Sequence, residues 1–281
     1  MMSRLLRANF MRLVKNKPFY ICIAVMAFCG IYLPVTDYSK MIKSGTVCIP
    51  DKNFFAFSVC MGVVAAFFIS MFIGTEYSCD TMRNKIATGR SRVKVYFANL
   101  ITVYAALLII CAAYVVPYLC AGIPLLGDFR VYGAEQIAVM LVCIGFIVFA
   151  YAVIFLTAAT LVQNKASSAV GCIMAAYFLL FGGVYINSCL MQEEFTDNVY
   201  LNESGETVQE LHKPNPDYVD GTKRKIYEFI NDVLPGNQSF SIMMWDGSDM
   251  SRIYRMELFS SAFAAVSMTV GVILFRRKDL K

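Results

Sequence analysis

The stretch GTEYSCDTMRNKIATGRSR, residues 74–92, joins two long apolar runs and decides how the chain is interpreted. It carries four basic side chains and two acidic ones between segments of membrane character. The pattern predicts a short helix over about Tyr77–Thr88, which Gly89 would end because glycine readily adopts the left-handed conformation after a helix. A plain hairpin between two spans needs only a few residues. The stretch therefore predicts either a charged helical knob for a soluble partner or a basic anchor at the lipid headgroups.

The composition around this stretch is that of an integral membrane protein. Hydrophobic residues make up 58% of the 281 residues and charged residues 16%, whereas soluble domains are about 45–50% apolar and about 25% charged. The net charge of +5 sits in the connections and tails, so no nucleic-acid partner is expected. These values exclude a soluble protein.

Six apolar runs approach or exceed the length of about 20 residues that one helix needs to cross a bilayer core. They are 19–35, 54–74, 95–123, 134–162, 166–190 and 254–275. The third run is long for one span, so either Pro117 bends it or its end lies in the interface. The predicted fold class is all-α, a polytopic membrane protein with six transmembrane helices in one domain over 1–281.

The lysines and arginines of the short connections set the expected orientation. With the N-terminus in the cytoplasm, most of them lie on the cytoplasmic side, as the positive-inside rule requires. This predicts an N-in/C-in topology. It places 75–92 in the cytoplasm and 191–253 outside.

Residues 1–17 show the pattern of an amphipathic helix that lies in the membrane interface and contacts lipid. The expected apolar face holds Leu6, Phe10, Leu13 and Val14, and the basic face holds Arg4, Arg7 and Lys15. The alternative is a basic flank of the first span without a structure of its own.

The outer segment 191–253 has two parts. The first part is acidic and poor in apolar residues, which predicts a loop or a small hairpin. The second part predicts an amphipathic helix that Thr222 caps and that Pro235–Gly236 ends. Its apolar face consists of Ile226, Phe229, Ile230 and Val233. This helix is either a lid near an exit or a simple lead into the last span.

Small residues recur at four-residue spacing in the fifth run, at Ser167, Gly171 and Ala175. Such a stripe permits close helix packing, and the partner is either another helix of the chain or a second copy. The ten cysteines are scattered, and a disulfide between Cys48 and Cys189 is one possibility at the outer face.

Several motifs are absent from the sequence. It has no GxxxxGK[ST] phosphate-binding loop and no Cys/His zinc pattern, and the middles of the spans are free of charged residues. Ion-coupled carriers usually place a carboxylate there. No catalytic residue, cofactor or metal is therefore expected, and a carrier or intramembrane hydrolase is disfavoured.

The stretch GTEYSCDTMRNKIATGRSRVKVYFANL resembles the segment after the second span of ABC-2 type exporter permeases. In that family the pattern is roughly G-x-E-Y, then Thr, basic residues, G-x-[ST]-R and an aromatic residue. The matching residues here are Gly74, Glu76, Tyr77, Thr81, Arg83, Lys85, Gly89, Ser91, Arg92 and Tyr96. Asp80 stands where relatives often have glycine, which changes the local turn. The end LFRRKDLK and the stretch DVLPGNQ also resemble the family.

The resemblance implies that residues 75–92 form a coupling helix that rests on a separate ATP-binding cassette ATPase subunit. Two permease chains, the same or related, would form the pathway, and this chain would hydrolyse no ATP itself. The residues expected at the ATPase contact are Glu76, Tyr77, Asp80, Thr81, Arg83, Lys85, Gly89 and Arg92. The resemblance further implies a multi-pass protein of a bacterial plasma membrane.

For function, we expect a permease subunit that exports a peptide, an antibiotic or another amphipathic substrate. A membrane sensor or scaffold, with an outer ligand-binding segment and a cytoplasmic docking loop, is the alternative. A standalone carrier or channel is the third hypothesis.

Overall fold

The structure is a computed structural model that describes residues 2–45, 47–201, 207–245 and 250–278. Its elements are α1 (Met2–Val14), α2 (Lys17–Ser44), α3 (Asp51–Phe54), α4 (Ala56–Ser78), α5 (Thr81–Ala87), α6 (Arg92–Leu126), α7 (Ala134–Val162), α8 (Lys165–Leu190), β1 (Phe195–Leu201), β2 (Thr207–Pro214), α9 (Gly221–Val233), α10 (Pro235–Met243) and α11 (Met250–Arg277). The described part is therefore a helical protein with one small hairpin.

Six helical segments of the described chain are long and apolar enough to cross a membrane, as the sequence predicts. They are α2, α3 with α4, α6, α7, α8 and α11. The all-α polytopic fold class is thereby confirmed.

The helices extend beyond several of the apolar runs because a helix continues until something terminates it. The helix α2 reaches Ser44, and Gly45 then adopts a φ of 67°. The helix α6 passes through Pro117 and Pro124 without interruption and ends at Leu126. The helix α7 has the predicted bounds.

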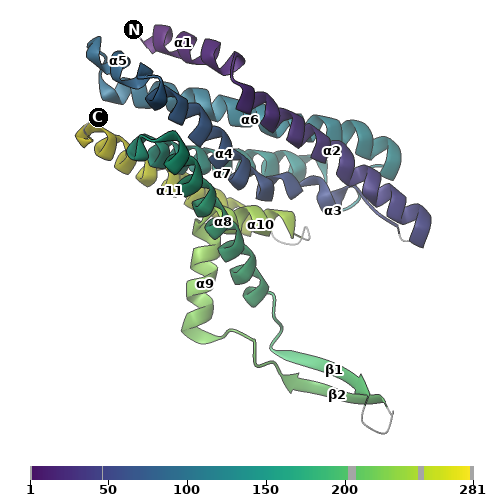
Figure 1. Ribbon diagram of the computed structural model, residues 1–281. Helices are drawn as coiled ribbons and strands as arrows, with labels where there is room; N and C mark the ends of the chain where they lie inside the picture. Colours follow the sequence, from purple (N-terminus) through teal and green to yellow (C-terminus); the bar gives the residue numbers. More distant parts are fainter. Residues whose placement is uncertain (1, 46, 202–206, 246–249, 279–281) are drawn as a thin grey trace.

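The centre of the bundle is formed by α4 and α7, and the other spans surround them (Figure 1). Of the 18 residues that form the apolar part of each span, 61% are buried in α3 with α4 and in α7, compared with 22% in α8 and in α11. The outer helices approach closely where glycine allows it. A Cβ atom on Gly30 of α2 would lie 2.6 Å from the carbonyl oxygen of Tyr114 in α6.

Both termini, α1 and α5 lie at one end of the bundle, and α3 lies at the other (Figure 1). We call these the α5 end and the α3 end. The helix α8 begins at the α5 end, since a Cβ atom on Gly74 would lie 2.9 Å from the Cα atom of Lys165. The helix α11 finishes there, next to Arg92. Leu190 and Met250 are consequently at the ends of their helices that are remote from α5.

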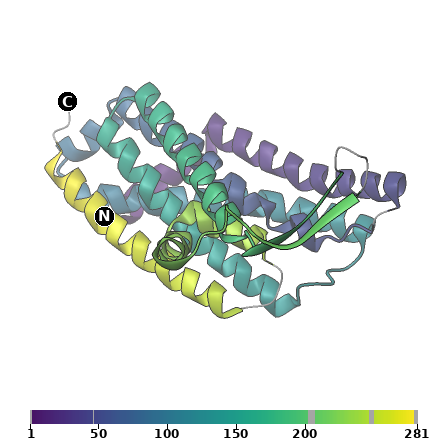
Figure 2. The ribbon, with the colours of Figure 1, turned by 90° about the horizontal axis from the view of Figure 1, so that it is seen from below.

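The outer segment leaves the bundle as the antiparallel hairpin β1–β2 and returns through α9 and α10. Figure 2 shows α9 end-on between α8 and α11. The prediction that Thr222 caps α9 is wrong, because the helix begins at Gly221 and Asp220 occupies the N-cap position. The predictions for this segment also cover 202–206 and 246–249, which lie outside the described residues.

The helix α10 was not predicted. Pro235 ends α9 as expected, but it is also the first residue of a second helix, a position that suits proline because its missing N–H is not needed there. This helix enters the bundle and packs against α4, α7 and α8. Its residues Asn237, Gln238 and Ser239 are buried.

The apolar face of α9 is only partly covered by the bundle. Ile226 and Phe229 are exposed, Ile230 and Val233 are half-buried, and Asn231 is the buried residue of the helix. Buried Asn231 and the contact of the Phe229 ring with α11 attach this helix, and the exposed part of its apolar face is available to lipid or to another surface.

The helix α1 lies along α6 with Leu5, Asn9 and Leu13 buried. Of the predicted apolar face, Leu13 is buried on the bundle, whereas Phe10 and Val14 are exposed, so the expected contact with lipid stays a prediction. Leu5 and Leu13 pack on the bundle. Asn9 lies between them in the same row and is buried because its amide donates to Asn99 of α6.

Two further expectations concern surfaces. Ser167, Gly171 and Ala175 are exposed, and no atom lies within 4 Å of a Cβ atom built on Gly171, so the stripe packs on no helix of the described chain. All ten cysteines are free, so Cys48 and Cys189 form no disulfide.

Candidate functional site

Residues 74–92 do not form one continuous helix. They contain the end of α4, the short helix α5 and the first residue of α6. The helix α4 continues to Ser78, so the prediction that the short helix begins at Tyr77 is wrong. The chain reverses at Asp80, whose φ of 54° lies in the left-handed region that favours glycine. The helix α5 follows, and Gly89 has a φ of 82°, as expected for the residue that ends it. A residue in the left-handed conformation therefore precedes α5, and another follows it.

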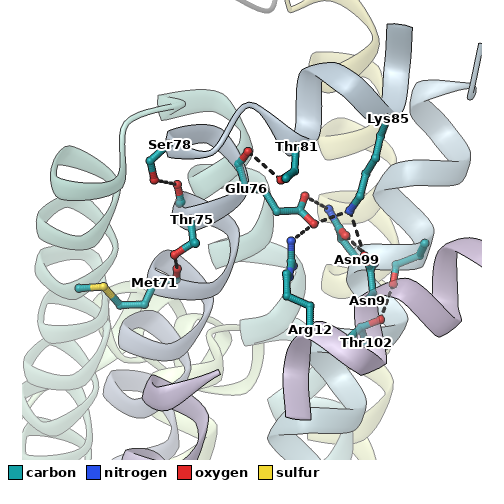
Figure 3. A network of polar contacts seen from close by, with 12 residues as sticks. Asn9, Arg12, Met71, Thr75, Glu76, Ser78, Thr81, Lys85, Asn99 and Thr102 are labelled. Atoms are coloured by element: carbon teal, nitrogen blue, oxygen red, sulfur yellow. Dashed lines mark hydrogen bonds and ion pairs between the residues drawn. The ribbon is translucent and has the colours of Figure 1, made fainter. Parts of the chain in front are cut away.

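Glu76, in the last turn of α4, is the centre of a buried ionic network (Figure 3). Its side chain is completely buried. The Nη1 atom of Arg12 from α1 and the Nζ atom of Lys85 from α5 both donate to Oε1 of Glu76. One carboxylate thus binds two cations that come from two other helices.

Two asparagines complete this network. The Nδ2 atom of Asn99 in α6 donates to Oε2 of Glu76 over 3.2 Å. The Nδ2 atom of Asn9 in α1 donates to Oδ1 of Asn99 over 2.7 Å, and Nζ of Lys85 donates to Oδ1 of Asn9 over 2.9 Å. The four side chains therefore form a closed ring of hydrogen bonds that joins α1, α4, α5 and α6.

Burial and charge act against each other in this ring. Burial lowers the pKa of the Lys85 ammonium, and the carboxylate of Glu76 opposes that change. Burial likewise lowers the pKa of Arg12, against the same carboxylate, and its guanidinium lies 3.8 Å from the centroid of the Phe72 ring. Removing one member of such a buried group leaves the others without compensation. The network is consequently a rigid joint between the four helices.

The surface of this element that faces solvent is separate from the ring. Asp80, Thr81, Arg83, Asn84 and Gly89 are exposed. The Thr81 hydroxyl also donates to the carbonyl oxygen of Glu76 over 3.0 Å, which satisfies a free carbonyl at the end of α4. Of the residues predicted at the ATPase contact, Asp80, Thr81, Arg83 and Gly89 are therefore free to meet a partner.

The other predicted contact residues have partners within the chain. Glu76 and Lys85 belong to the ring, and the Tyr77 hydroxyl donates to the carbonyl oxygen of Thr160 in α7 over 3.0 Å. Arg92 donates to the carbonyl oxygens of Phe275 and Arg276 at the end of α11, over 3.3 and 3.1 Å. These residues connect α5 and its flanks to the spans.

Sequence reasoning missed Asn9, Arg12 and Asn99 as members of the site. Each sits in a segment of other character, and the partners are remote in sequence. The one available signal was an amide side chain near the start of an apolar run, at Asn99.

Within the described ranges, no three His, Cys, Asp or Glu side chains are grouped in a way that could hold a metal ion. The arrangement offers mechanical connection and a docking surface.

Comparison with known proteins assigns the chain to a group. A family model described as "ABC-2 family transporter protein" matches residues 5–198, which is more than half of the chain and includes most of α1, all of α5 and all members of the ring. A search of curated proteins found no match.

Proposed function

Since this chain belongs to the ABC-2 family of transporter proteins and is a membrane subunit of an ABC transporter, we propose that it exports an amphipathic substrate with energy from a separate ATPase subunit. The observation that carries the proposal is the Glu76 ring directly behind the exposed surface of α5. A surface helix that merely anchored a loop to lipid would need no buried ionic joint to three other helices.

In the proposed mechanism, the ATPase docks on the exposed surface formed by Asp80, Thr81, Arg83, Asn84 and Gly89. When the ATPase subunits close on ATP, they displace α5. Lys85 then carries the displacement to Glu76, and the ring carries it to α1, α4 and α6 together. Because the ring is closed and buried, the four helices move as one body instead of deforming singly.

The surfaces of the spans support a proposal for the substrate class. A groove of about 400 Å³ between α2, α4, α6 and α10 is lined by apolar, aromatic and sulfur-containing side chains, among them Met26, Tyr32, Phe57, Cys60 and Tyr114. Such a lining suits an apolar or amphipathic molecule and offers a bare ion no ligands. We therefore favour a peptide or an antibiotic of that character as the cargo, moved outward across a bacterial plasma membrane.

A second permease chain would complete the pathway. The helix α8 leaves Ser167, Gly171 and Ala175 exposed beside large apolar side chains such as Phe178 and Phe181. Small residues between large ones permit the close contact of two helices in a membrane. This face of α8 is the surface on which we place the second copy or a related chain.

The test is the variant Arg83→Glu, with Lys94→Glu as the matched control. Both side chains are exposed and both changes reverse one charge, but Lys94 lies in α6 outside the docking surface. Tagged chains are extracted from native membranes in mild detergent, and co-purifying proteins are identified by mass spectrometry. We expect a near-stoichiometric ATPase with the wild type and Lys94→Glu, and strong loss of it with Arg83→Glu.

Two results would contradict the proposal. If the wild type brings down a kinase or receptor in place of an ATPase, the chain is a sensor or scaffold. If the ATPase stays with Arg83→Glu as firmly as with Lys94→Glu, the exposed surface of α5 is not the docking site.

A further inference from the structure

A polar pocket of about 330 Å³ lies where α9 crosses the ends of α8 and α11. Leu190 is the last residue of α8, and Arg252 and Arg255 are in the first two turns of α11. Both helices are candidate spans, and these are the ends remote from α5. The pocket is therefore at the level where the headgroups of one leaflet meet the protein.

Some charged side chains of the pocket have an ion-pair partner within the described part of the chain and others have none. The Nε atom of Arg224 lies 3.2 Å from Oε1 of Glu228, one turn further along α9, so these two charges neutralise each other. Across the described residues, Arg252 and Arg255 have no hydrogen bond and no ion pair within 4 Å. They act through space on Asp232, whose pKa burial raises and these two arginines lower. Two guanidinium groups thus face the pocket with most of their donors unused.

An apolar surface adjoins these charges. Phe229 lines the pocket with 60% of its surface exposed, and its ring packs edge-on against Phe259 of α11 at 6.0 Å between centroids. Leu258, the next exposed residue on α11, has an exposed fraction of 68%. The pocket is therefore bordered on the membrane side by apolar side chains, as an amphiphile would require.

We propose that this pocket binds an anionic phospholipid of the phosphatidylglycerol type. Arginine is well suited to phosphate because its planar guanidinium presents paired donors, and Arg252 and Arg255 supply two such groups. Arg224 and Glu228 neutralise each other. The remaining charged side chains of the pocket are Arg252, Arg255 and Asp232, which together leave one positive charge. This matches a headgroup with one negative charge. Asp232 accepts hydrogen bonds from the headgroup hydroxyls, and an acyl chain lies along Phe229 and Leu258.

This lipid site is independent of the ATPase and of the cargo. Bound lipid would add a connection between α9 and α11, which already pack against each other. It would therefore stabilise the outer segment at the point where the chain turns back into the bundle through α10.

The experiment compares Arg252→Gln/Arg255→Gln with Arg276→Gln/Arg277→Gln, which makes the same change at the opposite end of the same helix. The full chain is purified in a neutral detergent, and lipid binding is followed by native mass spectrometry and by thermal unfolding. Phosphatidylglycerol, phosphatidylcholine and soluble glycerol 3-phosphate are titrated separately. We expect phosphatidylglycerol to raise the unfolding temperature of the wild type and the control, and to bind the Arg252/Arg255 variant about tenfold or more weakly.

Three results decide the proposal. Equal phosphatidylglycerol binding by both double variants overturns the site. Stabilisation by glycerol 3-phosphate that matches that by the lipid shows a site for a soluble phosphate ester and overturns the lipid assignment. If the Arg252/Arg255 variant does not fold, the single variants Arg252→Gln and Arg255→Gln replace it, and phosphatidylglycerol binding by both that equals that of the wild type overturns the site.

Discussion

Two buried polar networks at different places in this bundle differ in the kind of group that they use. At the α5 end, Glu76 gathers the full charges of Arg12 and Lys85 with two asparagines. Around α10, the network is neutral. The Nδ2 atom of Asn187 in α8 donates to Oδ1 of Asn231 over 2.8 Å, and Nε2 of Gln238 donates to the carbonyl oxygen of Met256 over 3.1 Å. Ser260 of α11 donates in turn to Oε1 of Gln238.

The difference teaches how each network responds to force and to mutation. Charged groups attract over longer distances and are costly to leave unpaired, so an ionic joint holds helices together through a movement. Amides and hydroxyls are specific at short range and cost less when broken, so a neutral network can open and close. The charged ring accordingly suits transmission, and the neutral network suits a part that changes partners.

The largest expected effect is that of Glu76→Ala. It leaves Arg12 and Lys85 in a buried site without their anion, which is expected to lower the free energy of unfolding by about 3–5 kcal/mol. Chemical unfolding of the purified chain in detergent measures this.

The control for Glu76→Ala replaces all three charged side chains of the network by apolar ones. The triple variant Arg12→Met, Glu76→Leu and Lys85→Met is expected to regain most of the stability, since a well-packed apolar group can replace a buried ion pair. ATP-driven transport should stay lost in this variant. Normal transport by the triple variant would show that the ring has only a structural role.

The next effect is that of Gln238→Ala in α10. The change leaves the Ser260 hydroxyl and the Met256 carbonyl without their buried partner, and the expected loss is about 1–3 kcal/mol in the same unfolding measurement. Ser261→Ala is the matched control, because the exposed Ser261 hydroxyl donates only to a carbonyl of its own helix, that of Leu258. A loss as large as that of Glu76→Ala would remove the distinction between the two networks.

A smaller effect is expected for Arg92→Ala. The guanidinium satisfies carbonyl oxygens at the end of α11, and a basic group at that position also complements the helix dipole. The expected loss is about 1 kcal/mol, with faster hydrogen exchange confined to the last turn of α11. Lys94→Ala should leave that exchange unchanged. Protection of the last turn equal to that of the wild type would contradict the capping role.

The smallest effect is that of Asp80→Gly, and its sign is opposite. Asp80 is held at a φ of 54° and makes no capping hydrogen bond with its side chain. Glycine adopts this conformation more easily, so a gain of about 0.5–1 kcal/mol is expected. Gly89→Ala, at a φ of 82° with open space around it, should lose a similar amount. A destabilised Asp80→Gly would mean that the carboxylate has a partner in the working complex.

Much of this fold could be predicted because long apolar runs carry their own evidence. The run 134–162 has the same bounds as α7, since Gly133 precedes it and Gln163 takes up the left-handed conformation after it. The end of α5 at Gly89 and the existence of a helix that ends at Pro235 were also readable, since both depend on neighbouring residues.

The parts that could not be predicted depend on partners remote in sequence. The stretch PGNQSFSIM, which forms α10, is short and polar, and no periodic apolar pattern marks it. It is helical and buried in a place where α11 supplies partners for the Gln238 amide and Asn187 of α8 accepts from the Ser241 hydroxyl. The same holds for Asn9, which is buried in α1 because Asn99 and Lys85 meet it across the fold.

The burial of α10 has a consequence for how the chain is made. The insertion machinery reads hydrophobicity as each segment emerges, and α10 with Asn237, Gln238 and Ser239 has too little to enter a bilayer by itself. Its partners Met256 and Ser260 belong to α11, which is synthesised later. With the N-in/C-in topology expected from the sequence, the segment α9–α10 crosses the membrane first and folds back into the bundle after α11 has arrived. Substitutions at Ser260 should then appear as defects of biogenesis, with an outer segment that proteases reach, before they appear as defects of transport.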